Sequence, residues 1–160
     1  MPISKFVPYT VVILLRLSAL LHSFMPKKIA LVGHCGPDSS YLRMVVQRAG
    51  KDVQVLMADD DTDLSRVLSA GVDLILFNRE LGYGFTYQTG VEAIKHLRKV
   101  SPHLKTMLVS NYPDAQAAAV AEGALPGFGK REIGSPRVVE LIQEALGVES
   151  AAAGGKTSKA

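Results

Sequence analysis

Short apolar runs alternate strictly with amphipathic stretches from residue 27 to residue 147. The runs lack a polar side, and in the stretches between them apolar residues recur at helical spacing. Parallel strands joined by helical crossovers are buried on both faces, which produces such runs. The pattern therefore predicts an α/β fold with a doubly wound, parallel, five-stranded sheet. The expected strands are 29–32, 53–56, 72–77, 106–109 and 125–129, and the expected helices run from Asp38 or Ser39 to residue 49 and over 61–70, 90–100, 115–122 and 136–146.

The length of the chain bounds the number of domains. The 160 residues, 48% of them hydrophobic, are enough for one well-formed core and too few for two comfortable ones. We expect one domain over 26–147, preceded by an extension over 1–25. Residues 148–160 are mainly alanine, glycine, serine and lysine, and we expect a disordered tail there.

The extension is apolar over residues 6–15, but Arg16 interrupts it before the roughly 20 residues that a membrane span needs. Three interpretations stay open: a dispensable stretch upstream of a true start at Met25, an anchor or export signal, or a docking helix. The single cysteine, Cys35, excludes an internal disulfide and favours a reducing compartment. We therefore expect a cytoplasmic protein, with membrane association through residues 6–21 as the alternative.

The distribution of charge argues against binding to nucleic acid. The formal net charge is +3. Lys5 and Arg16 in the extension, and Lys156 and Lys159 against Glu149 in the tail, account for all of it. The predicted domain is neutral, and a nucleic-acid surface needs basic residues gathered on one face.

Polar residues follow the predicted strands at their carboxyl ends. Gly33 and His34 come after the first strand, Asn78 after the third, Ser110 after the fourth and Lys130 after the fifth. The carboxyl ends of parallel strands form the functional edge of such sheets, near the point where the strand order reverses. We expect these residues to share one site.

Ser110, Lys130 and the turn Glu122-Gly123-Ala124 carry a family resemblance, together with the strand and helix periodicity. Residues 27–147 resemble the receiver (CheY-like) domain of bacterial response regulators, a flavodoxin-like (βα)5 fold. The resemblance implies two-component or phosphorelay signal transduction. In that family an aspartate ending strand three accepts a phosphoryl group from a histidine kinase, and acids after strand one help bind Mg²⁺. The hydroxyl and the lysine contact the phosphoryl oxygens.

Three positions depart from the family pattern. Asn78 stands where the acceptor aspartate belongs, and Gly33 and His34 replace the acids. An amide has no ionised form near pH 7, and Mg²⁺ requires oxygen ligands. We expect no phosphorylation at Asn78 and no Mg²⁺ or other cofactor. Asp38 is expected to cap the next helix, and Lys130 to donate to the Asn78 side-chain oxygen or to a backbone carbonyl, or else to be a free surface lysine.

The segment after Asn78 is longer than the family usually has. It contains three aromatic residues, Tyr83, Phe85 and Tyr87, and glycines that permit tight turns. Two alternatives stay open: an adhesive tip for a partner protein, or rings that fold back over the edge of the sheet.

Cys35 suggests a rival function, because the glycine-bearing turn within 33–40 could bind phosphate on its backbone amides. Where a cysteine phosphatase needs an arginine, this chain has Tyr41. His34 and Cys35 are too few ligands for zinc. The acidic run 59–63 lacks the spacing of a calcium loop and predicts the start of a helix. A small phosphate-handling enzyme remains the alternative.

We expect a stand-alone pseudo-receiver that is not an enzyme and acts by protein–protein interaction. Its partner would be a histidine kinase, an output protein or a second copy in a homodimer. A regulator phosphorylated at another residue is the weaker alternative. The expected partner face combines the fourth helix, the fifth strand and the fifth helix, with a smooth apolar surface from Ala115, Ala117, Ala118, Ala119 and Phe128.

Overall fold

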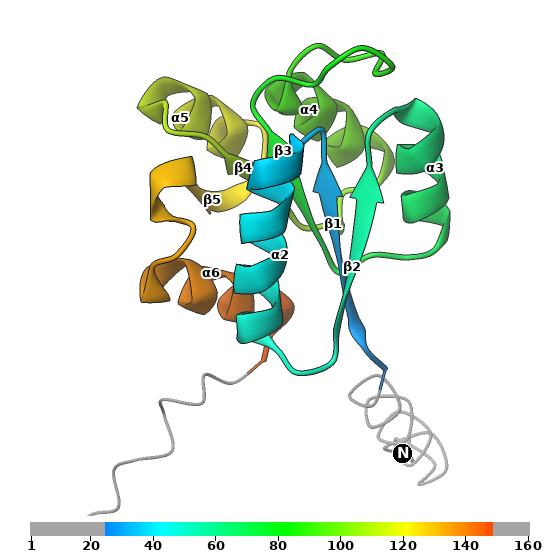
Figure 1. Ribbon diagram of the computed structural model, residues 1–160. Helices are drawn as coiled ribbons and strands as arrows, with labels where there is room; N and C mark the ends of the chain where they lie inside the picture. The colour runs from blue at the N-terminus through cyan, green and yellow to red at the C-terminus, as the bar shows by residue number, and fades with distance from the viewer. Residues whose placement is uncertain (1–24, 149–160) are drawn as a thin grey trace, which may run out of the picture.

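The computed structural model describes residues 25–148, and five strands in this part form one parallel sheet. The strand order is β2-β1-β3-β4-β5 (Figure 1). The predictions for the N-terminal extension and the tail fall almost entirely outside the described residues. The strands are β1 (Lys27–Val32), β2 (Val53–Ala58), β3 (Leu74–Asn78), β4 (Thr106–Val109) and β5 (Leu125–Phe128). The helices are α2 (Gly36–Ala49), α3 (Asp61–Ser69), α4 (Gly90–Val100), α5 (Pro113–Ala121), the 3-10 turn η1 (Lys130–Glu132) and α6 (Pro136–Leu146).

Side chains of successive strand residues point to opposite faces of the sheet, and both faces are buried. In β1, Ile29 and Leu31 pack under α2 and α6, whereas Ala30 and Val32 pack under α3, α4 and α5. All four side chains are fully buried. Helices on both faces explain why the strands read as continuous apolar runs. The predicted α/β, flavodoxin-like, doubly wound sheet is confirmed.

The strand order reverses beside β1, which pairs with β2 on one side and with β3 on the other. The loops that leave β1 and β3 therefore turn to opposite sides of the sheet and leave a crevice between them. Gly33 follows β1, and Asn78 is the last residue of β3. This topology brings the two positions together.

The helices differ in which groups accept hydrogen bonds from the free backbone N–H groups of their first turns. The Asp60 carboxylate accepts the backbone N–H of Asp63 at 2.7 Å, and Thr89 forms a reciprocal capping box with Glu92. The predicted cap at Asp38 is wrong, because α2 already begins at Gly36 and Asp38 lies in its first turn. None of the helices within 25–148 combines the length and apolarity needed to cross a bilayer.

Gly90 allows α4 to start directly against β3. A β-carbon there would overlap the Asn78 carbonyl oxygen and lie 2.8 Å from the Leu108 side chain. We expect Gly90→Ala to lower the free energy of unfolding by about 2 kcal/mol, because a close-packed contact cannot absorb an added methyl group. Gly36 is the first residue of α2, and a β-carbon added there would have no atom within 4 Å. Gly36→Ala should change stability by no more than about 0.5 kcal/mol. Urea unfolding measures both, and equal losses would contradict this packing.

Candidate functional site

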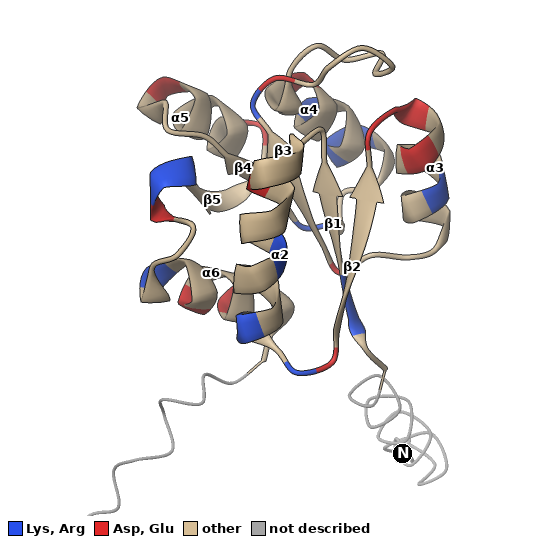
Figure 2. Cartoon of the chain, viewed as in Figure 1, with Lys and Arg blue, Asp and Glu red and all other residues tan. Residues whose placement is uncertain are grey.

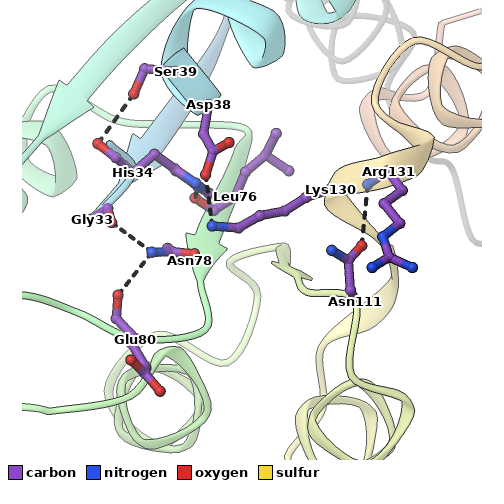
Figure 3. A network of polar contacts seen from close by, with 10 residues as sticks. All are labelled: Gly33, His34, Asp38, Ser39, Leu76, Asn78, Glu80, Asn111, Lys130 and Arg131. Atoms are coloured by element: carbon purple, nitrogen blue, oxygen red, sulfur yellow. Dashed lines mark hydrogen bonds and ion pairs between the residues drawn. The ribbon is translucent and has the colours of Figure 1, made fainter. Parts of the chain in front are cut away.

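The residues expected at the carboxyl edge of the sheet do lie together. Gly33 and His34 follow β1, Asp38 comes from the first turn of α2, Asn78 ends β3, and Lys130 begins η1 (Figure 3). Two of the polar contacts join these elements across the crevice, Asn78 to Gly33 and Lys130 to Asp38. The polar side chains of this site therefore bind one another or the backbone, beside β1 where the strand order reverses.

Asn78 uses both hydrogens of its side-chain amide on backbone carbonyls. Nδ2 donates to the Gly33 oxygen and to the Glu80 oxygen, each at 2.9 Å. These bonds tie the loop after β1 to the loop after β3. A carboxylate accepts hydrogen bonds and cannot donate them when ionised. The amide at position 78 therefore has a structural role that an aspartate cannot fill.

Asn78→Asp should lower the free energy of unfolding at pH 7 by about 1–3 kcal/mol, because a carboxylate oxygen would face two carbonyl oxygens with no hydrogen between them. The matched control is Asn111→Asp. The Asn111 side-chain oxygen accepts the Arg131 backbone N–H at 3.1 Å, which a carboxylate can also do. That control should cost less than about 0.5 kcal/mol in urea unfolding. Equal costs would refute the donor role of Asn78.

Lys130 is bound to Asp38. The Lys130 ammonium donates to the Asp38 carboxylate at 2.6 Å, and both side chains are partly buried. The predicted partners, the Asn78 oxygen or a backbone carbonyl, are wrong, and so is the free surface lysine. The hydrogen bond from Lys130 is the main cause that lowers the pKa of Asp38; burial opposes it, and a Cys35 contact adds to it. The pair ties α2 to η1.

His34 points into the protein and is only 5% exposed. Its Nε2 lies 2.9 Å from the Leu76 carbonyl oxygen and donates to it, while Nδ1 is buried with no hydrogen-bond partner in the described chain. Burial is the main cause that lowers the pKa of His34 to about 4. The hydrogen bond to the Leu76 carbonyl and the Asp38 charge oppose this shift, and the Lys130 charge adds to it. The imidazole is neutral at pH 7.

The lowered pKa makes stability depend on pH in a defined window. Below its ordinary pKa of 6.5 the unfolded state binds a proton at His34, and the folded state binds it only near pH 4. The unfolding free energy should be constant above about pH 6.5 and should fall by roughly 3 kcal/mol between there and about pH 4. Asp38, whose pKa is lowered from 3.8, acts mainly below this window.

His34→Gln should remove most of this fall, because glutamine can still donate to the Leu76 carbonyl and does not titrate. His103 is exposed. His103→Gln should leave the profile of the parent protein unchanged. Urea unfolding at a series of pH values provides the measurement. A parent-like slope in His34→Gln would contradict the assignment.

Ser110 and Lys130 flank a small cavity beside Asn78, of about 170 Å³. The Ser110 hydroxyl is buried and accepts the Tyr112 backbone N–H at 3.2 Å. Arg79 closes the rim: it pairs with Glu80 at 2.7 Å, and its guanidinium lies 4.4 Å from the centre of the Tyr112 ring. The cavity presents a hydroxyl and an ammonium group that is already paired.

Sequence reasoning missed the polar contacts of this site. It predicted neither the bonds that Asn78 and His34 donate to backbone carbonyls nor the Lys130–Asp38 pair and the stacking of Arg79 on Tyr112. Asp38 and Lys130 are 92 residues apart in sequence. Their only sequence signal is a lone acid and a lone lysine after two different strands. Nothing in the sequence around Tyr112 pointed to Arg79.

The three aromatic residues after β3 behave differently from one another. Tyr83 is fully exposed, whereas Phe85 and Tyr87 are half-buried and pack on the core. The Tyr87 ring lies 5.1 Å from the ring of His96. The alternative of rings folded over the sheet edge holds for Phe85 and Tyr87, and only Tyr83 projects.

The structure separates the two side chains, His34 and Cys35, that suggested the alternative of a phosphate-handling enzyme. His34 turns inward and Cys35 is exposed, so the two side chains are not a pair. Residues 36–40 belong to α2. Within residues 25–148 no group of three or more histidine, cysteine, aspartate or glutamate side chains could hold a metal ion.

The expected partner face is less smooth than predicted. Ala119 and Phe128 are each only 1% exposed, because both pack into the core, and Ala117 and Ala118 remain exposed. Next to α5 lies a hollow of about 850 Å³, whose lining includes Ala117 and the charged residue Arg131. This face therefore contains a hollow that is lined by both apolar and charged residues.

Solved structures of response regulators share this fold. The signal receiver domain of a DNA-binding response regulator from Colwellia psychrerythraea is 13% identical, with a TM-score of 0.61 over 76% of this chain and 98% of that one. A response regulator from Thermotoga maritima is 17% identical, with a TM-score of 0.58 over 77% and 99%. A third, from Burkholderia pseudomallei and solved with a phosphorylated aspartic acid, calcium ion and citrate, is 20% identical, with a TM-score of 0.55 over 79% and 69%.

The comparisons with sequences give no further match. No family model matches the chain, and no curated protein matches it. At identities of 13% to 20% the likeness to the solved structures concerns the fold. The chain has the fold of response regulator receiver domains.

Proposed function

We propose that this protein is a receiver-like module of a two-component or phosphorelay pathway that does not accept a phosphoryl group at Asn78. It requires no Mg²⁺, has no enzymatic activity of its own and acts by binding a protein. The partner is a histidine kinase, an output protein or a second copy. We place it in the cytoplasm, where a reducing environment suits the exposed thiol of Cys35.

The observation that carries this proposal is the pair of hydrogen bonds from Asn78. Both amide hydrogens are bound to carbonyls of the loops on either side of the crevice. The amide is thus part of the fold, and its remaining oxygen is a weak nucleophile. Gly33 and His34 bring no negative charge near it, and a buried neutral imidazole is no ligand for a hard cation.

The Lys130 contact supports a single resting state. In receivers, as the resemblance implies, the lysine and the hydroxyl contact the phosphoryl oxygens. Here Lys130 is bound to Asp38 and the Ser110 hydroxyl accepts the Tyr112 N–H without any added group. A conformational equilibrium shifts only when a ligand binds its two states differently. With no phosphoryl group to bind, this edge has no such ligand.

The hollow beside α5 offers a place for a partner. Val120 is 45% exposed on α5 and lines this hollow with Ala117, Pro126 and Arg131. Exposed apolar walls next to a charged residue are typical of protein interfaces, in which arginine is enriched. The mixed lining suits a kinase, an output protein or a second copy.

Incubation with acetyl phosphate and Mg²⁺ should leave the mass of the full chain unchanged. The reason is that β3 ends in an amide, Asn78, and that Gly33 and His34 stand where the family has metal-binding acids. Beryllofluoride with Mg²⁺ should shift no backbone amide signals at Gly33, Asn78 or Ser110. Asn78→Asp alone should gain little phosphate, because the metal ligands are still missing. Intact-mass spectrometry and amide NMR spectra measure these outcomes.

Two other outcomes would each support a different function, a regulator phosphorylated at another residue or a phosphate-handling enzyme. Acid-labile phosphate on an aspartate would overturn the proposal and establish a regulator phosphorylated elsewhere; peptide mapping would identify the residue. Turnover of a generic phosphate ester that stops when Cys35 is alkylated would establish a phosphate-handling enzyme.

A further inference from the structure

A single aromatic side chain projects from the carboxyl edge of the sheet. The Tyr83 loop, residues 81–89, joins β3 to α4, and the Tyr83 side chain has 106% of its reference exposure. A groove of about 500 Å³ lies along this loop, with Leu81 and Phe85 in its lining and Glu80 at one end of the segment. Leu81 is buried and Phe85 is half-buried, so the groove has an apolar floor.

The loop is held by hydrogen bonds on several sides. The Leu81 N–H donates to the Gln88 carbonyl at 2.8 Å. The Asp61 carboxylate accepts the N–H and the hydroxyl of Thr86 at 2.8 and 2.6 Å, and the Asp61 N–H donates to the Gly84 carbonyl at 3.0 Å. A fixed loop loses little conformational entropy when it binds, so Tyr83 is a preorganised contact.

Acidic residues surround this loop. The segments 59–63 and 80–92 contain no lysine, arginine or histidine. Figure 2 shows the acidic residues at the start of α3 and at the base of the loop. Their acidic residues are Asp59, Asp60, Asp61, Asp63, Glu80 and Glu92. The nearest arginine in sequence to Glu80, Arg79, pairs with it and stacks on Tyr112. Arg66 likewise pairs with Asp63 at 2.6 Å. Among the described residues this leaves Asp59, Asp60, Asp61 and Glu92 without an ion pair, and their field favours a cationic ligand.

We propose that the groove of the Tyr83 loop binds a lysine- or arginine-bearing segment of a partner protein. A cationic side chain of the partner lies on the Tyr83 ring, which attracts it through cation–π interaction, and apolar side chains cover Leu81 and Phe85. Asp59, Asp60 and Asp61 beside the loop supply the negative charge. Exposed tyrosines on fixed loops are frequent binding hot spots. This inference rests on the proposed role as an interaction module and names the chemistry of one partner.

The test uses the full chain and a hexapeptide of alternating arginine and leucine, followed by amide NMR at low salt. We expect shifts confined to residues 59–61 and 80–89. Tyr83→Ala should raise the Kd about fivefold or more, because it removes the cation–π contact. Asp59→Asn should raise the Kd about twofold and reduce its dependence on salt, because Asp59 is exposed and forms no ion pair with the described residues. A peptide with glutamate in place of arginine should not bind.

The matched control is Tyr112→Ala. Tyr112 is also exposed, at 59%, but its ring is covered by Arg79, so its removal should leave the Kd unchanged. Equal weakening by the two tyrosine variants, shifts centred on another surface, or equal binding of the glutamate peptide would overturn the docking site. Because the binding assay involves no phosphate, its failure would leave the unphosphorylated module intact, and phosphate on an aspartate would not affect the docking result.

Discussion

Helices cover both faces of the sheet, so polar side chains of the strands and their loops can gather only at its edges. At the carboxyl edge the backbone leaves the sheet in two directions, and its carbonyl groups need donors. The Asn78 amide supplies two of them across the crevice. The loops after β1 and β3 owe their relative position to this side chain. A carboxylate at the same point would repel the groups that the amide joins.

Charge at this edge is balanced within the protein. Lys130 and Asp38 neutralise each other, Arg79 and Glu80 do the same, and His34 is kept neutral by burial. A metal-dependent phosphoryl-transfer site instead gathers carboxylates whose repulsion the metal ion relieves. The pairing here leaves no such excess of negative charge around Asn78. This balance of charge supports the proposed function, in which position 78 accepts no phosphoryl group and no metal ion binds beside it.

The Tyr83 loop follows this balanced site in the chain and differs from it in charge. Asp60 and Asp61 lie beside the Tyr83 loop, and the Asp61 carboxylate accepts two hydrogen bonds from Thr86. The order of the loop comes from short-range contacts with α3 and from the capping box at Thr89. It does not depend on any conformational change at Asn78. The interaction surface that we propose for this loop therefore requires no phosphorylation.

The fold follows from the pattern of residues along the chain. Apolar runs with no polar face require a parallel sheet between helices, and this arrangement places four residues at one edge of the sheet: Gly33, Asn78, Ser110 and Lys130. Hydrophobic burial depends on composition and periodicity, which are local properties of the chain. The sequence also states directly that residue 78 is an asparagine and not an aspartate.

The pairing of polar groups depends on how the elements are arranged in space. Lys130 took Asp38 instead of Asn78 because α2 begins two residues before Asp38 and turns its carboxylate toward η1. Phe85 and Tyr87 packed inward while Tyr83 projected, because the bonds from Asp61 and Gln88 fix the course of the loop. Such contacts depend on angles and distances between elements far apart in sequence. Residue spacing along one segment does not contain that information.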